Sequence, residues 1–181
     1  MSSPQEVLEF WFSDAVRSQW WVKDPAFDEL VRSRLGELHR AAAAGELDGW
    51  ATTADGALAL VLLLDQVPRN IHRGAPESYA CDAKACAVTK EALAAGHDRE
   101  LVDDSRRLFL YLPLEHSEEL ADQERCLELT RPLEPTQWYD FAVRHHRIIA
   151  RFGRFPHRNE VLGRESTPEE IAFLEGPNSS F

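Results

Sequence analysis

The feature that most constrains this chain is the run ALALVLLL at residues 57–64, which is apolar on every side of any helix it could form. A helix of this kind is buried, because it has no polar face to turn toward water. The run is far shorter than the roughly 20 residues that a membrane span needs. Residues 53–66 are therefore predicted to form the central helix of a globular domain, ending or kinking at Pro68.

Helix start and stop signals punctuate the rest of the chain, and no segment shows the convincing alternation of a strand. Capping residues followed by proline open predicted helices at Ser3, Asp24 and Thr167. Pro113 and Gly153 are expected to end two others. The pattern predicts an all-α fold of about seven to eight helices, packed as antiparallel hairpins. We expect a single domain over residues 1–181, with a frayed tail at 176–181.

Polar side chains follow the apolar run directly, in the sequence DQVPRNIHR. Asp65 and Gln66 are expected to be at least partly buried, and a buried carboxylate must be paired or protonated. Two interpretations stay open at this point. Asp65 could form a salt bridge to Arg69 or another arginine, or it could bind a ligand or transfer a proton. Asn70 and Arg73 lie close enough in sequence to contact the same ligand.

A second polar cluster lies in LPLEHSEELADQ, after a proline break. Ser117 is predicted to cap the helix that follows. The positive end of that helix would disfavour a protonated His116, which would then be neutral near pH 7. A neutral His116 could accept a proton or bind a ligand, or it could make only a local hydrogen bond. Glu118 and Gln123 complete the cluster.

The third cluster is basic. Residues 144–164 hold six arginines and three histidines against one acid, in a chain whose net charge is -11. On a helix over residues 135–152, the predicted core-facing stripe consists of Phe141, His145, Ile148 and Phe152. Beside it would run an arginine row of Arg144, Arg147 and Arg151. These arginines repel one another unless anions lie between them, and the anions could be acids from other helices or a bound carboxylate or phosphate.

Several classes of function have little support. The net charge of -11 argues against general binding to nucleic acids or membrane surfaces. The three cysteines are odd in number and lack CxxC spacing, so we expect reduced thiols in a cytoplasmic protein without a signal peptide. The histidines lack metal-binding spacing, and neighbouring arginines would repel a cation. No nucleotide-binding or GxSxG motif occurs, so neither metal nor cofactor is expected.

Five stretches together resemble a widespread bacterial family known as domain of unknown function nine-two-four. They are VLEFWF, WWVKDPAFD, ALALVLLLDQVPRNIHRG, YLPLEHSE with the following Gln123, and RFGRFPHRNEVLGRESTPEE. The resemblance covers about residues 4 to 175. It implies an all-helical fold like that of tetratricopeptide repeats, in a cytoplasmic bacterial protein. It implies no catalytic residues.

We predict that the three clusters converge on one pocket for a small carboxylate or phosphate, with cofactor-independent acid–base catalysis as one outcome. The candidate acids and bases are His116, Glu118, His145 and Asp65. The candidate ligand-binding residues are Gln66, Arg69, Asn70, Arg73, Gln123, Arg147, Arg151, Arg154, His157, Arg158 and Asn159. The alternative is a helical interaction module, in which the same charges form an internal network. Its aromatic N-terminus or a groove would then contact a protein partner or a second copy.

Overall fold

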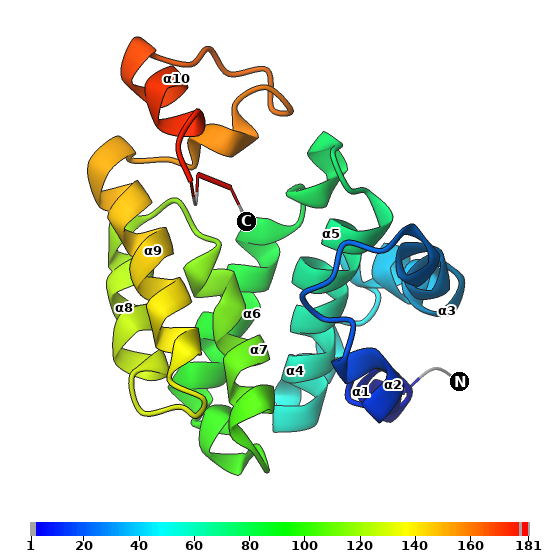
Figure 1. Cartoon of the computed structure of the whole chain (residues 1–181). Helices are drawn as coiled ribbons and strands as arrows, with labels where there is room; N and C mark the ends of the chain where they lie inside the picture. The colour runs from blue at the N-terminus through cyan, green and yellow to red at the C-terminus, as the bar shows by residue number, and fades with distance from the viewer. Residues whose placement is uncertain (1–2, 178, 181) are drawn as a thin grey trace.

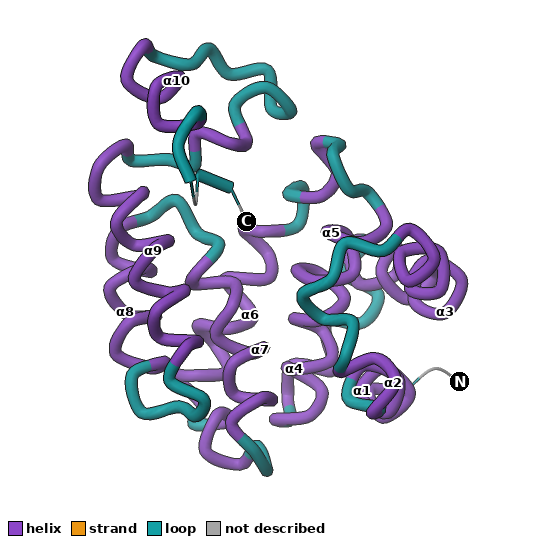
Figure 2. The backbone as a smooth tube through the Cα atoms, in the orientation of Figure 1, coloured by secondary structure: helices purple, strands orange, loops and turns teal. Residues whose placement is uncertain are grey.

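The computed structural model describes residues 3–177, 179 and 180, and within them all regular structure is helical (Figure 2). Its ten α-helices confirm the predicted all-α domain. Eight correspond to the expected segments, and the two additional helices are the short α2 (Asp14–Arg17) and α5 (Val67–Ile71). None of the helices in the described ranges is both long and apolar enough to cross a membrane.

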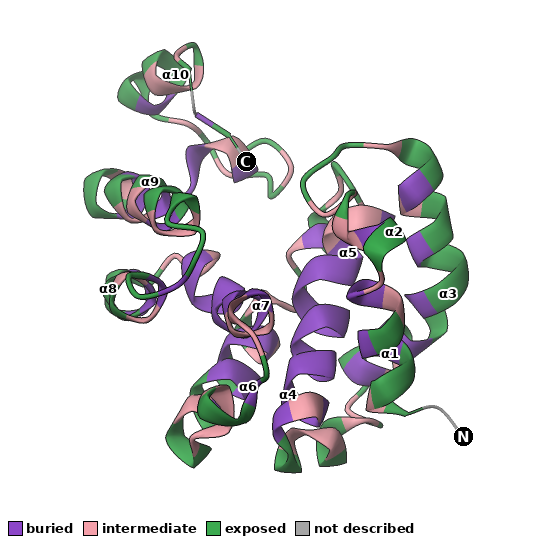
Figure 3. Ribbon diagram, turned by 60° about the horizontal axis from the view of Figure 1, so that its bottom comes forward, coloured by how far each residue is buried: buried purple, intermediate pink, exposed green. Residues whose placement is uncertain are grey.

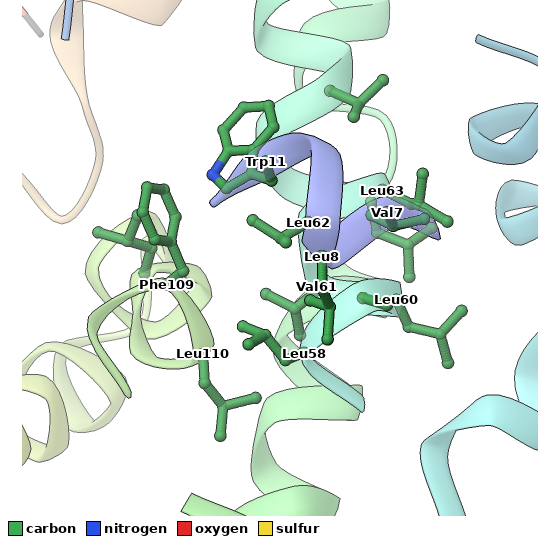
Figure 4. Packing of buried hydrophobic residues seen from close by; sticks show 14 of the residues in the cluster. Val7, Leu8, Trp11, Leu58, Leu60, Val61, Leu62, Leu63, Phe109 and Leu110 are labelled. Carbon is green, nitrogen blue, oxygen red and sulfur yellow. The ribbon is translucent and has the colours of Figure 1, made fainter. Parts of the chain in front are cut away.

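The central helix is α4 (Ala54–Val61), as the apolar run predicts (Figure 1). Every residue from Ala57 to Leu64 is 0 % exposed. Helix α1 (Pro4–Trp11) packs on one side of α4, and α6 and α7 pack on the other. Trp11 and Phe109 meet edge to face beside the α4 leucines, with ring centroids 5.8 Å apart (Figure 4). Burying one such side chain contributes about 1.5–3 kcal/mol, so α4 anchors the fold.

The C-terminal half consists of helices that pack in chain order, each against the next (Figure 1). They are α6 (Asp82–Ala95), α7 (Asp104–Glu115), α8 (Leu120–Thr130) and α9 (Gln137–Phe152). The outer helices α8 and α9 are largely exposed on their outward faces (Figure 3). Short α10 (Pro168–Leu174) lies beyond α9 and contacts the turn η5 (Pro156–Arg158). The likeness to tetratricopeptide-repeat packing stays a prediction.

Most predicted helix ends are confirmed. Asp24 caps α3 (Pro25–Ala43), which packs against the continuation of α4, and Ser3 caps α1. Thr167 forms a complete capping box at α10, and Gly153, with φ of +68°, closes α9. Ser117 is the exception, because α8 begins only at Leu120. The tail prediction falls partly on residues outside the described ranges.

Pro68 does not end the helix that α4 begins. The backbone widens into a π-turn, η2 (Leu62–Gln66), in which the N–H of Val67 donates to the carbonyl of Leu62, five residues back. The wider turn accommodates the proline that follows, and α5 then continues the helix. As a result, Asp65 and Gln66 are buried, at 0 % and 7 % exposed. Turns of this kind occur frequently at functional sites.

The prediction that Pro113 ends its helix is wrong. Helix α7 continues through Pro113 to Glu115. Proline interrupts the ladder of backbone hydrogen bonds, and here a side chain from the neighbouring helix supplies a donor within the disturbed turn. Thr89 of α6 donates from Oγ1 to the carbonyl of Leu110 at 2.9 Å. Because α7 continues past Pro113, Glu115 lies on the helix and inside the protein, where it is 4 % exposed.

The predicted core-facing stripe of α9 is half correct. His145 and Ile148 are buried, at 5 % exposed each, whereas Phe141 is 45 % exposed. Ala142 and Ile149 are buried instead. The buried face is therefore rotated away from Phe141, and the arginine row beside it lies on the solvent side of the helix.

Candidate functional site

A hydrogen-bonded pair of Asp65 and His116 lies at the centre of the polar region. Asp65 projects from the π-turn, and its Oδ1 is 2.7 Å from Nδ1 of His116, which follows the last residue of α7. Gln66 donates from Nε2 to the other carboxylate oxygen at 2.7 Å. Because an ionised carboxylate only accepts hydrogen bonds, Nδ1 of His116 carries the hydrogen and Nε2 keeps its lone pair.

The electrostatics keep this pair as a carboxylate beside a neutral imidazole. Burial acts to raise the pKa of Asp65, but Arg69, His116 and Gln66 outweigh it and hold that pKa below its usual value. Burial, followed by the charge of Arg69, lowers the pKa of His116 despite the opposing effect of Asp65. His116 is therefore neutral because of burial and Arg69, and not because of the positive end of the following helix, as the sequence predicted. His116 caps the C-terminal end of α7, where the helix dipole would favour the protonated ring.

Arg69 joins the pair to α6. Its two terminal nitrogens donate to the two carboxylate oxygens of Asp82, at 2.8 and 2.9 Å. One of them also lies 3.1 Å from Oδ1 of Asp65. This bidentate geometry is the strong form of an arginine–carboxylate contact. Arg69 therefore neutralises two carboxylates that would otherwise repel each other in a poorly solvated region.

Arg158 approaches the same acids from the C-terminal segment. It donates to Asp82 at 3.2 Å and to the backbone carbonyl of His116 at 3.1 Å. Its guanidinium lies between the rings of Tyr79 and Phe155, 4.5 Å from each ring centroid. Two aromatic faces and two acceptors hold the guanidinium firmly, and the side chain is only 7 % exposed.

A pocket of about 340 Å³ lies beside this arrangement. That volume is near the lower end of small-molecule sites, which range over roughly 300–1,000 Å³. His116 and Arg158 both contribute to its walls. The full, mostly apolar lining consists of Pro76, Tyr79, Ala80, Asp82, Ala83, Cys86, His116, Ser117, Glu118, Arg158 and Leu162.

The lining contains one hydroxyl and one thiol of the kinds that serve as nucleophiles, those of Ser117 and Cys86, and both contact Asp122. Ser117 donates from Oγ to Oδ2 of Asp122 at 2.8 Å, and the Cys86 thiol lies 3.3 Å from the same oxygen. Burial, and then the charge of Asp122, raises the pKa of Cys86 to about 12. The thiolate is therefore scarce near pH 7, and neither group is activated by His116.

Glu118 lines the pocket but is fully engaged. Its two oxygens accept from Arg164 at 2.7 and 3.0 Å, and Oε1 also accepts the N–H of Phe155 at 2.7 Å. Burial acts to raise the pKa of Glu118, but the Arg164 and Phe155 hydrogen bonds outweigh it and lower the pKa. This geometry makes Glu118 an ionised anchor for the C-terminal segment, in place of the predicted proton donor or acceptor.

His145 lies behind His116 and outside the pocket lining, with ring centroids 6.1 Å apart. Its Nδ1 donates to the carbonyl of Phe141 at 2.9 Å and lies 3.2 Å from Oε1 of Glu115. Burial, followed by the charge of His116, lowers the pKa of His145 to about 3. Burial, followed by the charge of Asp65, raises the pKa of Glu115 to about 8. Both groups are therefore mainly uncharged near pH 7.

The arginine row predicted to form one wall of the pocket does not do so. Arg147 and Arg151 are exposed on α9, and Arg151 lies 2.8 Å from Glu169. Arg154 is paired with Glu170 of α10 at 2.6 Å. For Arg147 and Arg151 the cause is the rotation of the buried face of α9, which turns them toward solvent, whereas Arg154 follows the end of that helix.

Three other residues predicted to bind the ligand, Arg73, Asn70 and Gln123, do not line the 340 Å³ pocket. Arg73 binds Asp28 of α3 at 2.7 Å, and with Asn70 it lines a separate groove of about 500 Å³. Gln123 donates to the carbonyls of Glu115 and Ser117, where it supports the end of α7.

Two further candidates belong to the C-terminal segment and are not in the pocket lining. Asn159 is 0 % exposed and accepts a hydrogen bond from Arg164. The ring of His157 lies 5.6 Å from that of Phe155, and burial, followed by the charge of Arg158, lowers the pKa of His157 to about 4.

Of the predicted residues, the structure thus brings together Asp65, Gln66, Arg69, His116, Glu118 and Arg158, with His145 behind them. It adds Tyr79, Asp82, Glu115 and Arg164, which were not predicted. Asp82 looked like an ordinary acid in the first turn of a helix. Glu115 was missed because the expected break at Pro113 placed it in a loop. The clearest available signal for it was an acid directly before His116.

The aromatic N-terminus largely fills the core. Trp11 and Phe12 are buried, and Trp20 packs on Phe109 with centroids 4.6 Å apart. Trp21 is 60 % exposed. Among the residues that the structure describes, no three histidine, cysteine, aspartate or glutamate side chains are grouped so as to hold a metal ion.

Comparisons with known proteins support the family resemblance. A search of curated proteins finds no match. One solved structure, described as the protein of unknown function ATU0120 from Agrobacterium tumefaciens, is similar at 45 % sequence identity with a TM-score of 0.90. The similarity covers 96 % of this chain and 97 % of that one. The family described as bacterial protein of unknown function (DUF924) matches residues 7–178, and this chain belongs to it.

Proposed function

We propose that this protein binds a small molecule in the 340 Å³ pocket and that His116, oriented by Asp65, moves a proton to or from it. The observation that carries the proposal is the position of His116. Its Nδ1 is fixed by a buried carboxylate at 2.7 Å, and the same residue also lines the pocket. A carboxylate that fixes one ring nitrogen leaves the other as the base, which is the usual arrangement of a catalytic histidine.

The burial of Asp65 supports the same proposal. A fully buried carboxylate is costly unless several groups stabilise it, and here Arg69, His116 and Gln66 do so together. A neutral histidine with a lowered pKa can act as a base near pH 7. The cytoplasmic location predicted from the unpaired thiols is part of this proposal, while a protein partner or a homodimer stays a separate prediction.

The proposed pocket can be tested by titrating the protein with a library of small carboxylates, phosphates and neutral carbonyl compounds. Binding is followed by NMR through the backbone amides of residues 79–86 and 116–118. We expect at least one class to bind the wild type and the Ala87→Trp variant but not Ala83→Trp. Ala83 lines the pocket, whereas Ala87 is exposed one turn further along the same helix and does not line it. Equal binding to both variants would place the ligand elsewhere.

The proton-transfer role has its own test, the tautomer of the His116 ring. We expect long-range ¹H–¹⁵N spectra to show hydrogen on Nδ1 and an unprotonated Nε2 at pH 7.5. Asp65→Asn should weaken that preference, because an amide can also donate to Nδ1. A wild-type ring that carries its hydrogen on Nε2 would rule out His116 as the base.

A further inference from the structure

The charges around the pocket cancel. Three acids are each bound to an arginine. The acids are Asp65, Asp82 and Glu118, and the arginines are Arg69, Arg158 and Arg164. Next to them, Lys90 binds Asp122 at 2.7 Å. His116 is neutral, and Glu115 behind it is mainly protonated near pH 7. A bound anion would therefore add an uncompensated negative charge to a partly buried region, which is costly.

Arg158 nevertheless retains unused hydrogen-bonding capacity. A guanidinium has five N–H donors, and the described residues accept from Arg158 at only two points, on Asp82 and on the carbonyl of His116. Its Nε is buried and has no acceptor in the described part of the chain. The side chain is more than nine-tenths buried and lines the pocket. Each of its terminal nitrogens donates one of its two N–H bonds to these acceptors, so a ligand oxygen is a suitable additional acceptor there.

A hydrogen bond joins Arg158 to the backbone carbonyl of His116 at 3.1 Å. It ties the guanidinium to the same residue whose ring acts as the base. A ligand in the pocket can thus contact a fixed cation and a fixed imidazole at the same time. A cation beside a base is suited to a reaction that forms a negative charge on oxygen as the base takes up a proton.

Building on the proposed function, we infer that the substrate is a small neutral carbonyl compound from which His116 removes a proton on the carbon next to the carbonyl. The C–H bond breaks and its proton passes to Nε2 of His116. The electron pair of that bond forms the C=C bond of an enolate. The electrons of the C=O bond move to oxygen, where Arg158 stabilises the negative charge. The new imidazolium and enolate charges cancel, so the region stays neutral overall.

The environment of the possible nucleophiles favours this reaction over covalent catalysis. Ser117 donates its hydrogen bond to Asp122, and the Cys86 thiol contacts the same carboxylate. Neither is activated by His116. Proton abstraction needs only the base and the stabilising cation that the pocket already provides.

The test is exchange of the C3 protons for deuterium in D₂O, followed by ¹H NMR, in 2-oxobutanamide and in the matched carboxylate 2-oxobutanoate. We expect the wild type to accelerate exchange in the neutral amide more than in the carboxylate, each relative to its uncatalysed rate. His116→Gln should lower the enzymatic rate by about 10²–10⁴-fold. Arg158→Gln should lower it by about 10²–10³-fold, the cost of losing an oxyanion donor.

Arg147→Gln serves as the control, because Arg147 is exposed on α9 and away from the pocket. If Arg158→Gln fails to fold, Arg158→Lys keeps the charge while losing the planar donor fork, and should still lower the rate by at least tenfold.

No acceleration in either compound overturns the inference, and so does a preference for the carboxylate. If ligands still bind the pocket in the NMR titration, the proposed function survives that result. If no compound binds in the pocket, the proposed function and the inferred substrate class both fail.

Discussion

Acid–arginine contacts in this protein occur in two settings that differ in exposure to water. The buried cluster consists of Asp65, Arg69, Asp82 and Arg158, with side chains 0–19 % exposed. The surface pair consists of Arg151 and Glu169, with side chains 53 % and 65 % exposed. Both show good geometry, at 2.8 Å for Arg69 to Asp82 and for Arg151 to Glu169.

The difference teaches that pairing distance alone does not reveal the energetic weight of a contact. In water, an ion pair gains little because solvent already stabilises both charges. In a buried region, each charge depends on its partner, and loss of the partner leaves an uncompensated charge. The basic stretch of the sequence contains both kinds, since Arg158 belongs to the buried cluster and Arg151 to the surface pair.

Arg69→Met should have the largest effect on stability. The substitution leaves Asp65 without its arginine and deprives Asp82 of its bidentate partner, while methionine preserves much of the side-chain volume. We expect the free energy of unfolding to fall by about 3–5 kcal/mol, the usual cost of breaking a buried pair. Urea denaturation at pH 7 measures it.

Arg40→Met is the matched control for Arg69→Met. Arg40 contacts Glu37 at 3.1 Å on the outside of α3, and its side chain is 73 % exposed. Its loss should change stability by no more than about 0.5 kcal/mol. If Arg69→Met cost as little as the control, the buried cluster would not differ energetically from a surface pair.

The next largest effect concerns the dependence of stability on pH, through Glu115. Its folded-state pKa of about 8 lies above its ordinary value, so the folded protein holds the proton more tightly than the unfolded chain. The resulting stabilisation is complete at low pH and is lost as the pH rises toward 8 and above. Four histidines, His39, His116, His145 and His157, have lowered pKa values and act in the opposite sense. Their contribution still changes between pH 6.5 and about 7.5, because a histidine of the unfolded chain is half protonated at pH 6.5.

Between pH 6.5 and 8, ionisation of Glu115 should therefore cost the wild type about 1–2 kcal/mol of stability, set against the opposite change from the histidines, which Glu115→Gln shares. Glu115→Gln keeps an uncharged side chain of similar shape, and should remove most of that slope. Chemical denaturation of both proteins at pH 6.5, 7.25 and 8 measures the difference. Parallel curves for the two proteins would mean that Glu115 is already ionised at pH 6.5.

Much of the fold follows from local signals in the sequence. About seven to eight helices were predicted from local start and stop signals, among them the caps at Ser3, Asp24 and Thr167, which satisfy backbone donors with nearby side chains. The buried central helix followed from composition alone. The helix continues past both prolines, for a local reason at Pro68 and a tertiary one at Pro113. The helix passes Pro68 by widening into a π-turn, and Thr89 of a neighbouring helix contributes a donor near Pro113.

The candidate site was predicted less completely. Asp65, His116 and Arg158 were found because each is a polar residue at a position where the helical pattern expects burial or a break. Arg147 and Arg151 were placed in the pocket wrongly, because spacing fixes which residues share a face but not which neighbour that face meets. A rotation of α9 that exposes Phe141 is enough to turn the row to solvent. Asp82 is recognisable only once Arg69 of α5 and the first residue of α6 are placed in contact.

Arg151→Ala should have the smallest effect of the three. In the sequence-based hypothesis, this arginine held the ligand, so its loss would abolish binding without affecting the free protein. The structure places it on the outer face of α9, where it contacts Glu169 and stacks on the ring of Phe152 at 4.6 Å. An exposed pair of this kind contributes about 0–1 kcal/mol. We therefore expect stability to change by less than about 1 kcal/mol, and ligand affinity in the NMR titration to match the wild type. A loss of binding with unchanged stability would return Arg151 to the site and show that burial does not separate the two kinds of arginine.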